Sequence, residues 1–314
     1  MTEASDTGSG LWSARLRRYG LLSVTGEDAR AFLHAQLTND IEQMPTDQAR
    51  LAGWCSAKGR LLASFLVMPR NQDFLLQLAA DLVPAVAKRL SMFVLRSRVK
   101  ISDLGSEQGQ LGLWGAAAPA RLAQLGIRLG EAPMACAVRD ELTAVRVDRD
   151  RVLIVGPEAA LARLESGLGA TEGGEDMWTL AEIRAGRPLI RQATQDLFVP
   201  QMVNLEALGA VDFKKGCYPG QEVVARAQYR GQVKRRMVRG ALEAGAEAGP
   251  GADLYSDDVP GQASGTVVDS APSAEGRELL AVVPVSALER QARVRLAPGG
   301  PALQILSLPY SPSS

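Results

Sequence analysis

The stretch FKKGCYPGQEVVARAQYRGQVKRR, residues 213–236, is the most unusual part of the sequence and decides how the fold of the rest is interpreted. Cys217 lies between Gly216 and a Pro219-Gly220 pair, which suits the two central positions of a type II turn. Gly216 allows another stretch of backbone to come close on the other side of the thiol. The pattern therefore predicts that Cys217 is presented on a loop.

Positive charge is concentrated around this cysteine. From Lys214 to Arg239 the sequence has eight Lys or Arg residues and one acidic residue, Glu222. A nearby cation stabilises a thiolate relative to a thiol, so Cys217 is expected to be more reactive at pH 7 than a free cysteine. The alternative is that Cys217 is a small buried apolar residue and the basic run a solvated face. Spacing alone does not decide between the two.

Working outward, hydrophobic periodicity predicts alternating strands and helices. A helix is expected to start at Thr25 and Gly26, with Thr25 as its N-cap and the apolar residues from Ala29 to Leu37 on one face. The apolar runs on either side of PRNQD, within residues 51–78, predict a hairpin. The sequence has no GxGxxG pattern and no P-loop, which favours α+β layers over a dinucleotide-binding sheet. Further helices are expected over 81–96, 157–167 and 177–185, and further strands over 98–104, 143–147 and 151–155.

The composition changes near residue 240. Beyond it, turns rich in Gly, Pro, Ser and Ala separate short apolar runs such as GTVVD and LLAVVPV. Short strands at regular spacing with turn signals between them are typical of small all-β domains. Residues 241–314 are therefore expected to form a small C-terminal β-barrel domain.

Overall composition excludes several classes of protein. The chain has 314 residues, 46% of them apolar, and 35 Lys or Arg against 35 Asp or Glu, so no global field attracts nucleic acid or an anionic membrane. No apolar run approaches the length of a membrane span, and the N-terminus resembles neither a signal peptide nor a transit peptide. A cytoplasmic protein with no membrane partner is expected.

Histidine and cysteine usage narrows the chemistry further. The sequence has one histidine, His34, which excludes most His-based triads and metal cages, and three cysteines without a CxxC pair. No metal site is expected, and the cysteines are expected to be reduced thiols. His34 itself is interpreted as a helix-surface or hydrogen-bonded residue.

The signature resembles that of a known family. KKGCYPGQE, followed by VVAR and YRGQVKRR, is similar to the KGCYxGQE signature of the YgfZ family, folate-binding relatives of the glycine-cleavage T-protein. The resemblance extends over nearly the whole chain. It includes VTGEDARAFLHAQLTND at 24–40, AKGRLLASFLV at 57–67, IRAGRPLI at 183–190, FVPQMVNLEALGAVDF at 198–213 and LPYS at 308–311.

The resemblance implies an α+β fold arranged as a three-domain, T-protein-like ring. Two interleaved α+β domains, the GcvT-like N-terminal region, would occupy residues 11–240, with the C-terminal β-barrel over 241–314. The ring would surround an opening that accepts tetrahydrofolate or a one-carbon derivative. A monomer is expected.

The resemblance also implies site residues. Cys217 would be the functional thiol, surrounded by Lys215, Gln221, Glu222 and Arg226. Tyr19 and Trp178 match the positions of folate-contacting aromatic residues, although close relatives carry Trp where this chain has Tyr19. Asn39, Asp40 and Glu206 are expected near the same opening. For Asn39 and Asp40, termination of the preceding helix is an alternative.

By resemblance, the function would be that of an accessory factor in the assembly or repair of iron-sulfur enzymes, including one that modifies tRNA. The expected partners are folate and iron-sulfur client proteins, with no direct nucleic acid contact and no classical catalytic turnover. The alternative is a folate-dependent aminomethyltransferase of the glycine-cleavage type. T-proteins place an Asp pair in the central hairpin, where this sequence has Ala63 and Ser64, so acid or base catalysis at the folate is unsupported.

The sequence does not determine the client proteins, the folate species, the oligomeric state or the role of the thiol. Cys217 could react covalently, ligate a cluster transiently or shape the folate opening. A third hypothesis, an RNA-binding module using the basic run, is disfavoured by the zero net charge and the lack of RNA-binding aromatic motifs.

Overall fold

The computed structural model describes residues 10–229, 231 and 233–312. The chain forms two compact units whose segments interleave along the sequence. Unit 1 contains Met1–Arg30, Gln43–Arg50 and Leu66–Glu175. Unit 2 contains Ala31–Glu42, Leu51–Phe65 and Asp176–Ser314.

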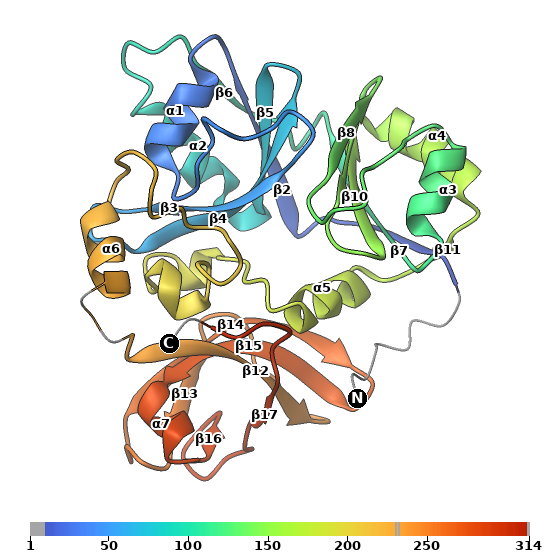
Figure 1. Cartoon of the computed structure of the whole chain (residues 1–314). Coiled ribbons are helices and arrows are strands. Elements are labelled where there is room, and N and C mark those ends of the chain that lie inside the picture. Colours follow the sequence, from blue (N-terminus) through green and yellow to red (C-terminus); the bar gives the residue numbers. More distant parts are fainter. Residues whose placement is uncertain (1–9, 230, 232, 313–314) are drawn as a thin grey trace. The chain divides into compact units, whose positions relative to one another are not determined.

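A six-stranded sheet with the strand order β11-β1-β7-β10-β9-β8 is the first layer of unit 1 (Figure 1). Helices α3 and α4 pack against it through a core that includes Leu113, Leu122, Val152 and Leu161. All pairings are antiparallel except β1 with β11, where Trp12 lies opposite Thr171. The elements are β1 Trp12–Arg15, β7 Gly109–Trp114, α3 Ala118–Gln124, β8 Cys136–Arg139, β9 Leu142–Arg146, β10 Arg151–Gly156, α4 Glu158–Leu168 and β11 Thr171–Glu172.

The second group of strands in unit 1 is formed by the end of β4 (Leu61–Arg70) with β5, β2 and β6, all antiparallel. Nearly continuous apolar runs in β4 and β5 are buried, which is typical of strands covered on both faces. Gly20 in β2 permits a close approach, because a Cβ there would lie 2.2 Å from Val83 Cγ2 of α2. The elements are β2 Tyr19–Thr25, β5 Asp73–Ala79, the 3₁₀ turn η1 Ala80–Leu82, α2 Val83–Ser91 and β6 Lys100–Asp103.

Unit 2 begins with α1 (Ala29–Gln36), of which residues 31–36 belong to this unit, and continues with β3 (Arg50–Cys55) and the first half of β4. Its other helical elements are α5 Glu175–Arg184, η2 Gln192–Thr194, η3 Pro200–Val203 and α6 Gln221–Tyr229. The turn between β3 and β4 and the signature stretch thus belong to one compact unit.

The C-terminal part of unit 2 is a curved, six-stranded antiparallel sheet with the order β16-β13-β14-β15-β12-β17 (Figure 1, orange to red). Its apolar core includes Val238, Leu254, Val267 and Leu279. Register shifts in β13 and β14 mark bulges, which increase local twist and bend a sheet. The elements are β12 Arg235–Glu243, β13 Asp253–Ser256, β14 Ala263–Ser273, β15 Gly276–Pro284, α7 Val285–Glu289, β16 Val294–Arg295 and β17 Gln304–Leu306.

Most predicted elements are present. The hairpin around residue 71 and the strands after residue 240 are confirmed. The helix expected from Thr25 and Gly26 begins later, at Ala29, because Thr25 still belongs to β2 and Gly26 has a φ of +115°, outside the helical region. The helix expected over 81–96 is shorter, because α2 ends at Ser91 and the chain continues in single turns. Leu95 then has a φ of +46°, which a right-handed helix cannot accommodate. In the described part of the chain, no helix combines the length and apolarity needed to cross a membrane.

Leu161 offers a test of the unit 1 core. Leu161→Ala removes a fully buried side chain between α4 and the sheet, and we expect it to lower the free energy of unfolding by about 2–5 kcal/mol. Urea titration followed by circular dichroism measures the loss. Met92→Ala is the control, because Met92 is 69% exposed and should change stability by less than about 0.5 kcal/mol. Equal effects of the two substitutions would contradict this packing.

Candidate functional site

The signature stretch forms a turn that leads into α6. Gly220 has a φ of +80°, as the second central residue of a type II turn requires. A Cβ on Gly220 would lie 2.4 Å from the carbonyl oxygen of Ser56 and 2.7 Å from Gly59 Cα, so only glycine allows this contact with the turn between β3 and β4. The turn at Gly220 holds the backbone next to Cys217 against the turn between β3 and β4.

Cys217 is exposed at this turn, as the surrounding glycines and proline predicted, whereas Cys55 and Cys136 are buried. Burial raises the pKa of both buried thiols to about 12, and the nearby Asp47 adds to the effect at Cys136. At neutral pH the two buried thiols are protonated and shielded from reagents. Chemistry of a thiol with a molecule in solution is therefore restricted to Cys217.

Lys215 has a structural role that the sequence does not reveal. Its ammonium donates to the carbonyl oxygens of His34 and Leu37, the latter at 2.6 Å, at the C-terminal end of α1. The same ammonium lies 5.0 Å from the centre of the Tyr218 ring. Burial lowers the pKa of Lys215 to about 8, while the nearby Asp40 acts in the opposite direction. Lys215 thus anchors the signature stretch to the end of α1.

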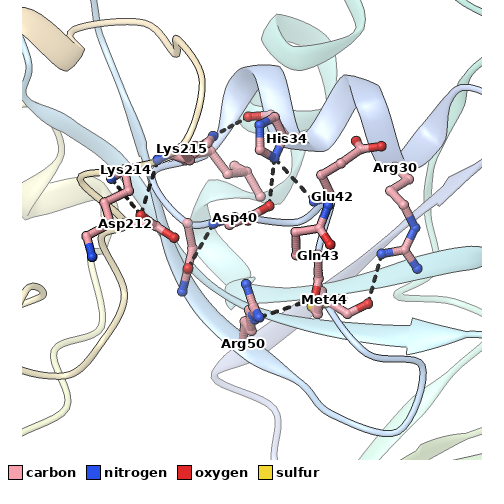
Figure 2. A network of polar contacts seen from close by, with 12 residues as sticks. Arg30, His34, Asp40, Glu42, Gln43, Met44, Arg50, Asp212, Lys214 and Lys215 are labelled. Carbon is pink, nitrogen blue, oxygen red and sulfur yellow. Dashed lines mark hydrogen bonds and ion pairs between the residues drawn. The ribbon is translucent and has the colours of Figure 1, made fainter.

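Asp212 shapes the backbone before the anchor. Its Oδ1 accepts hydrogen bonds from the backbone N–H groups of Lys214 and Lys215, at 2.7 and 3.2 Å. Figure 2 shows Asp212, Lys214 and Lys215 together beside the end of the helix that carries His34. Lys214 itself is exposed, so one of the two lysines of the signature faces solvent and the other is buried.

His34 and Asp40 form a polar pair at the end of α1. His34 Nδ1 lies 3.0 Å from Asp40 Oδ1 and 3.2 Å from the backbone nitrogen of Glu42 (Figure 2). On the opposite side of the ring, His34 Nε2 lies next to Gly216, where a Cβ would be 3.4 Å away. The single histidine is hydrogen-bonded, as expected, and it lies beside the residue that precedes Cys217.

The side chain of Asn39, which follows α1, forms hydrogen bonds with three backbone groups. Its Nδ2 donates to the carbonyl oxygens of Leu51 and Gly209 at 2.7 and 2.8 Å, and its Oδ1 accepts from the N–H of Asp40. These contacts join three segments of unit 2 and fit the structural alternative considered for Asn39. A folate contact by Asn39 or Asp40 stays a prediction.

The other predicted neighbours of the thiol lie on α6. Gln221 Nε2 is 3.5 Å from the carbonyl oxygen of Lys215, whereas Glu222 and Arg226 are exposed. The structure thus places Lys215, Cys217, Gln221, Glu222 and Arg226 in one turn and the helix that follows it. Their chemical roles stay predictions.

Glu206 belongs to a buried polar cluster, here called the 201–206 cluster, made of Gln201, Asn204, Glu206, Arg236 and Tyr310. Arg236 Nη1 donates to Glu206 Oε1 and, at 2.8 Å, to the carbonyl oxygen of Gln201. Among the described residues, Gln201 Oε1, Asn204 Oδ1 and Glu206 Oε2 are buried and receive no hydrogen bond. Three buried acceptors in six residues thus lack a donor.

Tyr310, in the C-terminal LPYS segment, is the last member of the 201–206 cluster and lies near Asn204 and Glu206. Its hydroxyl donates to the carbonyl oxygen of Gly186 at 2.7 Å. Burial, and to a lesser extent the charge of Glu206, raises the pKa of Tyr310 to about 12, against the opposing effects of Asn204 and Arg187. The phenol is therefore neutral at pH 7. Sequence reasoning predicted neither Arg236 nor Tyr310 as a site residue. The resemblance of LPYS at 308–311 to the family was the one signal for Tyr310.

The two aromatic residues matched to folate contacts lie in different units. Trp178 is buried on α5 in unit 2. Tyr19 is the half-buried first residue of β2 in unit 1, with the Arg18 guanidinium 5.8 Å from its ring centre. A joint contact of Tyr19 and Trp178 with folate stays a prediction.

A hollow in unit 1 is separate from the predicted site residues. A hollow of about 240 Å³ in unit 1 is lined by Arg139, Arg163 and Leu164, among others, and by none of the predicted site residues. In the part of the chain that the structure describes, no three His, Cys, Asp or Glu side chains gather as metal ligands would.

The fold and sequence relatives now define the class of protein. Residues 14–147 match the family model of the GCVT N-terminal domain. The crystal structure of the glycine cleavage system aminomethyltransferase T from Bartonella henselae is similar, with a TM-score of 0.75 and 20% identity, covering 96% of this chain and 87% of that one. The chain thus has the mixed α+β fold of a T-protein.

Curated relatives give the particular family. The chain is 34% identical over 299 residues to the tRNA-modifying protein YgfZ of Edwardsiella ictaluri, covering 92% of this chain and 89% of that protein. It is 31% identical to the YgfZ protein of an Escherichia coli strain, covering 93% and 91%. The chain belongs to the YgfZ family.

The exposure of the three thiols gives a direct prediction. In the native protein, we expect Ellman's reagent to modify one thiol quickly, and Cys217→Ala to abolish this reaction, because Cys55 and Cys136 are buried with raised pKa values. All three thiols should react in denaturant. Fast reaction of two or more thiols in the native wild type, or of any thiol in the native variant, would contradict the structure.

Lys215 predicts a dependence of stability on pH. Because its pKa is about 8 in the folded protein and 10.5 for a free lysine, the folded chain loses this proton at lower pH than the unfolded chain. The contribution of Lys215 to the free energy of unfolding therefore rises between about pH 8 and pH 10.5. Urea titrations of wild type and Lys215→Met across this range measure it. The difference between the two proteins should shift in favour of wild type as the pH rises; a constant difference would contradict the buried ammonium.

Proposed function

We propose that this chain is a tetrahydrofolate-binding accessory protein for iron-sulfur enzymes, with an indirect effect on tRNA modification. Its sequence relatives are named tRNA-modifying proteins, and its fold is that of a folate-linked aminomethyltransferase. The observation that carries the folate part of the proposal is the 201–206 cluster. The protein acts on client proteins in the cytoplasm as a monomer.

The chemistry of the 201–206 cluster fits a reduced pterin. The 2-amino group, N3–H and N8–H of tetrahydropterin are donors, and the cluster offers three buried acceptors without one. A buried acceptor left unpaired is destabilising by about 1–3 kcal/mol, so a donor-rich ligand would recover that loss on binding. Glu206 supplies negative charge and Arg236 holds the other oxygen of its carboxylate. Bound folate would supply a carrier for one-carbon groups.

The proposed arrangement of the rest of the site follows the family. Tyr19 and Trp178 would contact the folate ring system, and Asn39 and Asp40 would lie near the same opening. Two interleaved α+β domains over 11–240 and a closed barrel over 241–314 would form the ring around it. The curved sheet of β12–β17 and the interleaving of the two units support this arrangement.

An accessory role is favoured over aminomethyl transfer by two residues of β4, Ala63 and Ser64. At the position where T-proteins carry an Asp pair, Ala63 and Ser64 are buried. Ser64 Oγ is engaged with the backbone, since it accepts from the N–H of Ile190 at 3.0 Å and contacts the carbonyl oxygen of Pro188 at 3.3 Å. Neither side chain can act as a general base toward folate nitrogen, so these residues do not support transfer chemistry.

The folate proposal is tested by calorimetric titration with tetrahydrofolate. We expect binding with a Kd in the micromolar range, and about tenfold or greater weakening in Glu206→Gln, because a charge-assisted hydrogen bond is lost. Glu289→Gln is the control, since this exposed residue on α7 lies outside the cluster. Melting temperatures of both variants show whether the fold is kept.

The outcomes separate the alternatives. Absence of heat and of tryptophan quenching at accessible concentrations would remove the folate assignment. A glycine-cleavage assay on the same sample should give no turnover, and turnover would establish the aminomethyltransferase alternative instead. Equal affinities of Glu206→Gln and wild type would remove the 201–206 cluster from the site while leaving folate binding elsewhere intact.

A further inference from the structure

We infer that residues 92–98, the segment between α2 and β6 in unit 1 (Figure 1), form a docking loop for another protein. The partner surface that fits this docking loop is an apolar pocket with an acidic rim. The inference rests on the exposure, the backbone conformation and the charge of the segment. It does not depend on the 201–206 cluster or on Cys217, so its failure leaves the proposed function untouched.

Exposed apolar side chains are concentrated in the docking loop. Leu95 is 89% exposed, Met92 69% and Phe93 42%. The other large apolar residues that are exposed in the described part of the chain are scattered singly along the sequence. Single exposed apolar residues are ordinary on a protein surface, whereas a group of them favours a surface that another molecule covers.

The backbone of Leu95 is held in an unfavourable conformation. Its φ of +46° lies in the left-handed region, which crowds the Cβ of any residue other than glycine. Burial of the side chain would offset such a cost, but the side chain of Leu95 is almost fully exposed. Strained residues of this kind are concentrated at binding sites. A partner that covers Leu95 would supply the burial that the chain itself does not.

Hydrogen bonds fix the shape of the docking loop at both ends. The backbone N–H groups of Met92 and Phe93 donate to carbonyl oxygens three residues earlier, at 3.2 and 3.1 Å. At the other end, the N–H of Arg98 donates to Asp28 Oδ2 at 2.7 Å. A Cβ on Gly26 would lie 2.1 Å from the Arg98 carbonyl oxygen, so this close approach requires glycine. The docking loop therefore presents its apolar side chains in one arrangement, which lowers the entropic loss on binding.

Positive charge surrounds the apolar side chains. Between Asp81 and Asp103 the sequence has no acidic residue, and its five basic residues are all exposed. They are Lys88, Arg89, Arg96, Arg98 and Lys100. Arg98 is paired with Glu27 and Asp28, and an excess of positive charge is left on the segment. Complementary charge across an interface steers association and selects the partner, so the rim of the partner pocket should be acidic.

A protein fits the docking loop better than a lipid surface does. Met, Phe and Arg are enriched in the cores of protein–protein interfaces. A pocket of fixed shape gains from a loop of fixed shape, whereas a fluid bilayer gains nothing from a leucine that is held at a positive φ. The excess positive charge suits either surface, so lipid vesicles are included in the test.

The test begins with a random library of twelve-residue peptides displayed on phage. The library is selected on the full-length protein after removal of peptides that bind the Phe93→Ser, Leu95→Ser double variant. We expect the recovered peptides to combine Leu, Phe or Trp with Asp or Glu. Synthetic copies should bind the wild type in fluorescence anisotropy measurements, and added salt should weaken this binding because it screens the charges.

The substitution Leu95→Gly separates binding from folding. Glycine adopts a positive φ without strain, so the melting temperature should not fall, while peptide binding should weaken about tenfold or more because the anchoring side chain is lost. Arg96→Glu should weaken binding about three- to tenfold through charge repulsion. The matched controls are Val259→Ser, at an exposed apolar residue of unit 2, and Arg149→Glu, at an exposed cation outside the docking loop. Both should bind the peptides as the wild type does.

Several outcomes would overturn the inference. They are failure to recover peptides, recovery of peptides without acidic residues, and equal peptide binding by Leu95→Gly and wild type. A lower melting temperature of Leu95→Gly would contradict the unfavourable conformation on which the inference rests. Sedimentation with vesicles of equal parts phosphatidylglycerol and phosphatidylcholine tests the lipid alternative. If the wild type sediments with these vesicles and Leu95→Gly does not, the docking loop binds lipid and the inference is wrong.

Discussion

The contact between the Lys215 ammonium and the last carbonyl groups of α1 is the constraint on which the candidate site depends. The C-terminal carbonyls of a helix lack intrahelical donors and carry partial negative charge. A buried ammonium satisfies two of them at once, and the Tyr218 ring covers it. Because of this contact, the turn with Cys217 lies beside His34 and Asp40 and not elsewhere on unit 2. The packing of Gly220 against the turn between β3 and β4 is the second contact that fixes this loop.

The same contact shows what sequence could and could not predict about the site. The glycines and proline around Cys217 predicted an exposed thiol, because turn chemistry is local. The burial of Lys215 could not be predicted, since its acceptors lie on a helix 178 and 181 positions away. A KK pair in sequence suggests two solvated cations, and only the tertiary structure distinguishes Lys214 from Lys215.

For the fold as well, local elements could be predicted from the sequence and long-range pairings could not. Helices and strands with clear periodicity, such as α1 and the β4–β5 hairpin, follow from their apolar patterns. The parallel pairing of β1 with β11 does not, since β11 has two residues and no pattern of its own. The end of α2 could not be predicted either, because no Gly or Pro marks the position of Leu95, whose φ is positive. Of the 201–206 cluster, the sequence predicted Glu206 as a site residue. It did not predict Arg236 and Tyr310, because they come from segments that are distant in sequence.

The interleaving of the two units has a consequence for biosynthesis. The first strand of the chain pairs with residues 171 and 172, and α1 receives its capping ammonium from residue 215. Neither unit can therefore be completed while the first half of the chain emerges from the ribosome. Contacts this distant in sequence slow folding and prolong the time for which apolar strands are exposed. Synthesis must pass residue 171 before the sheet of unit 1 can be completed, and residue 215 before α1 receives its cap.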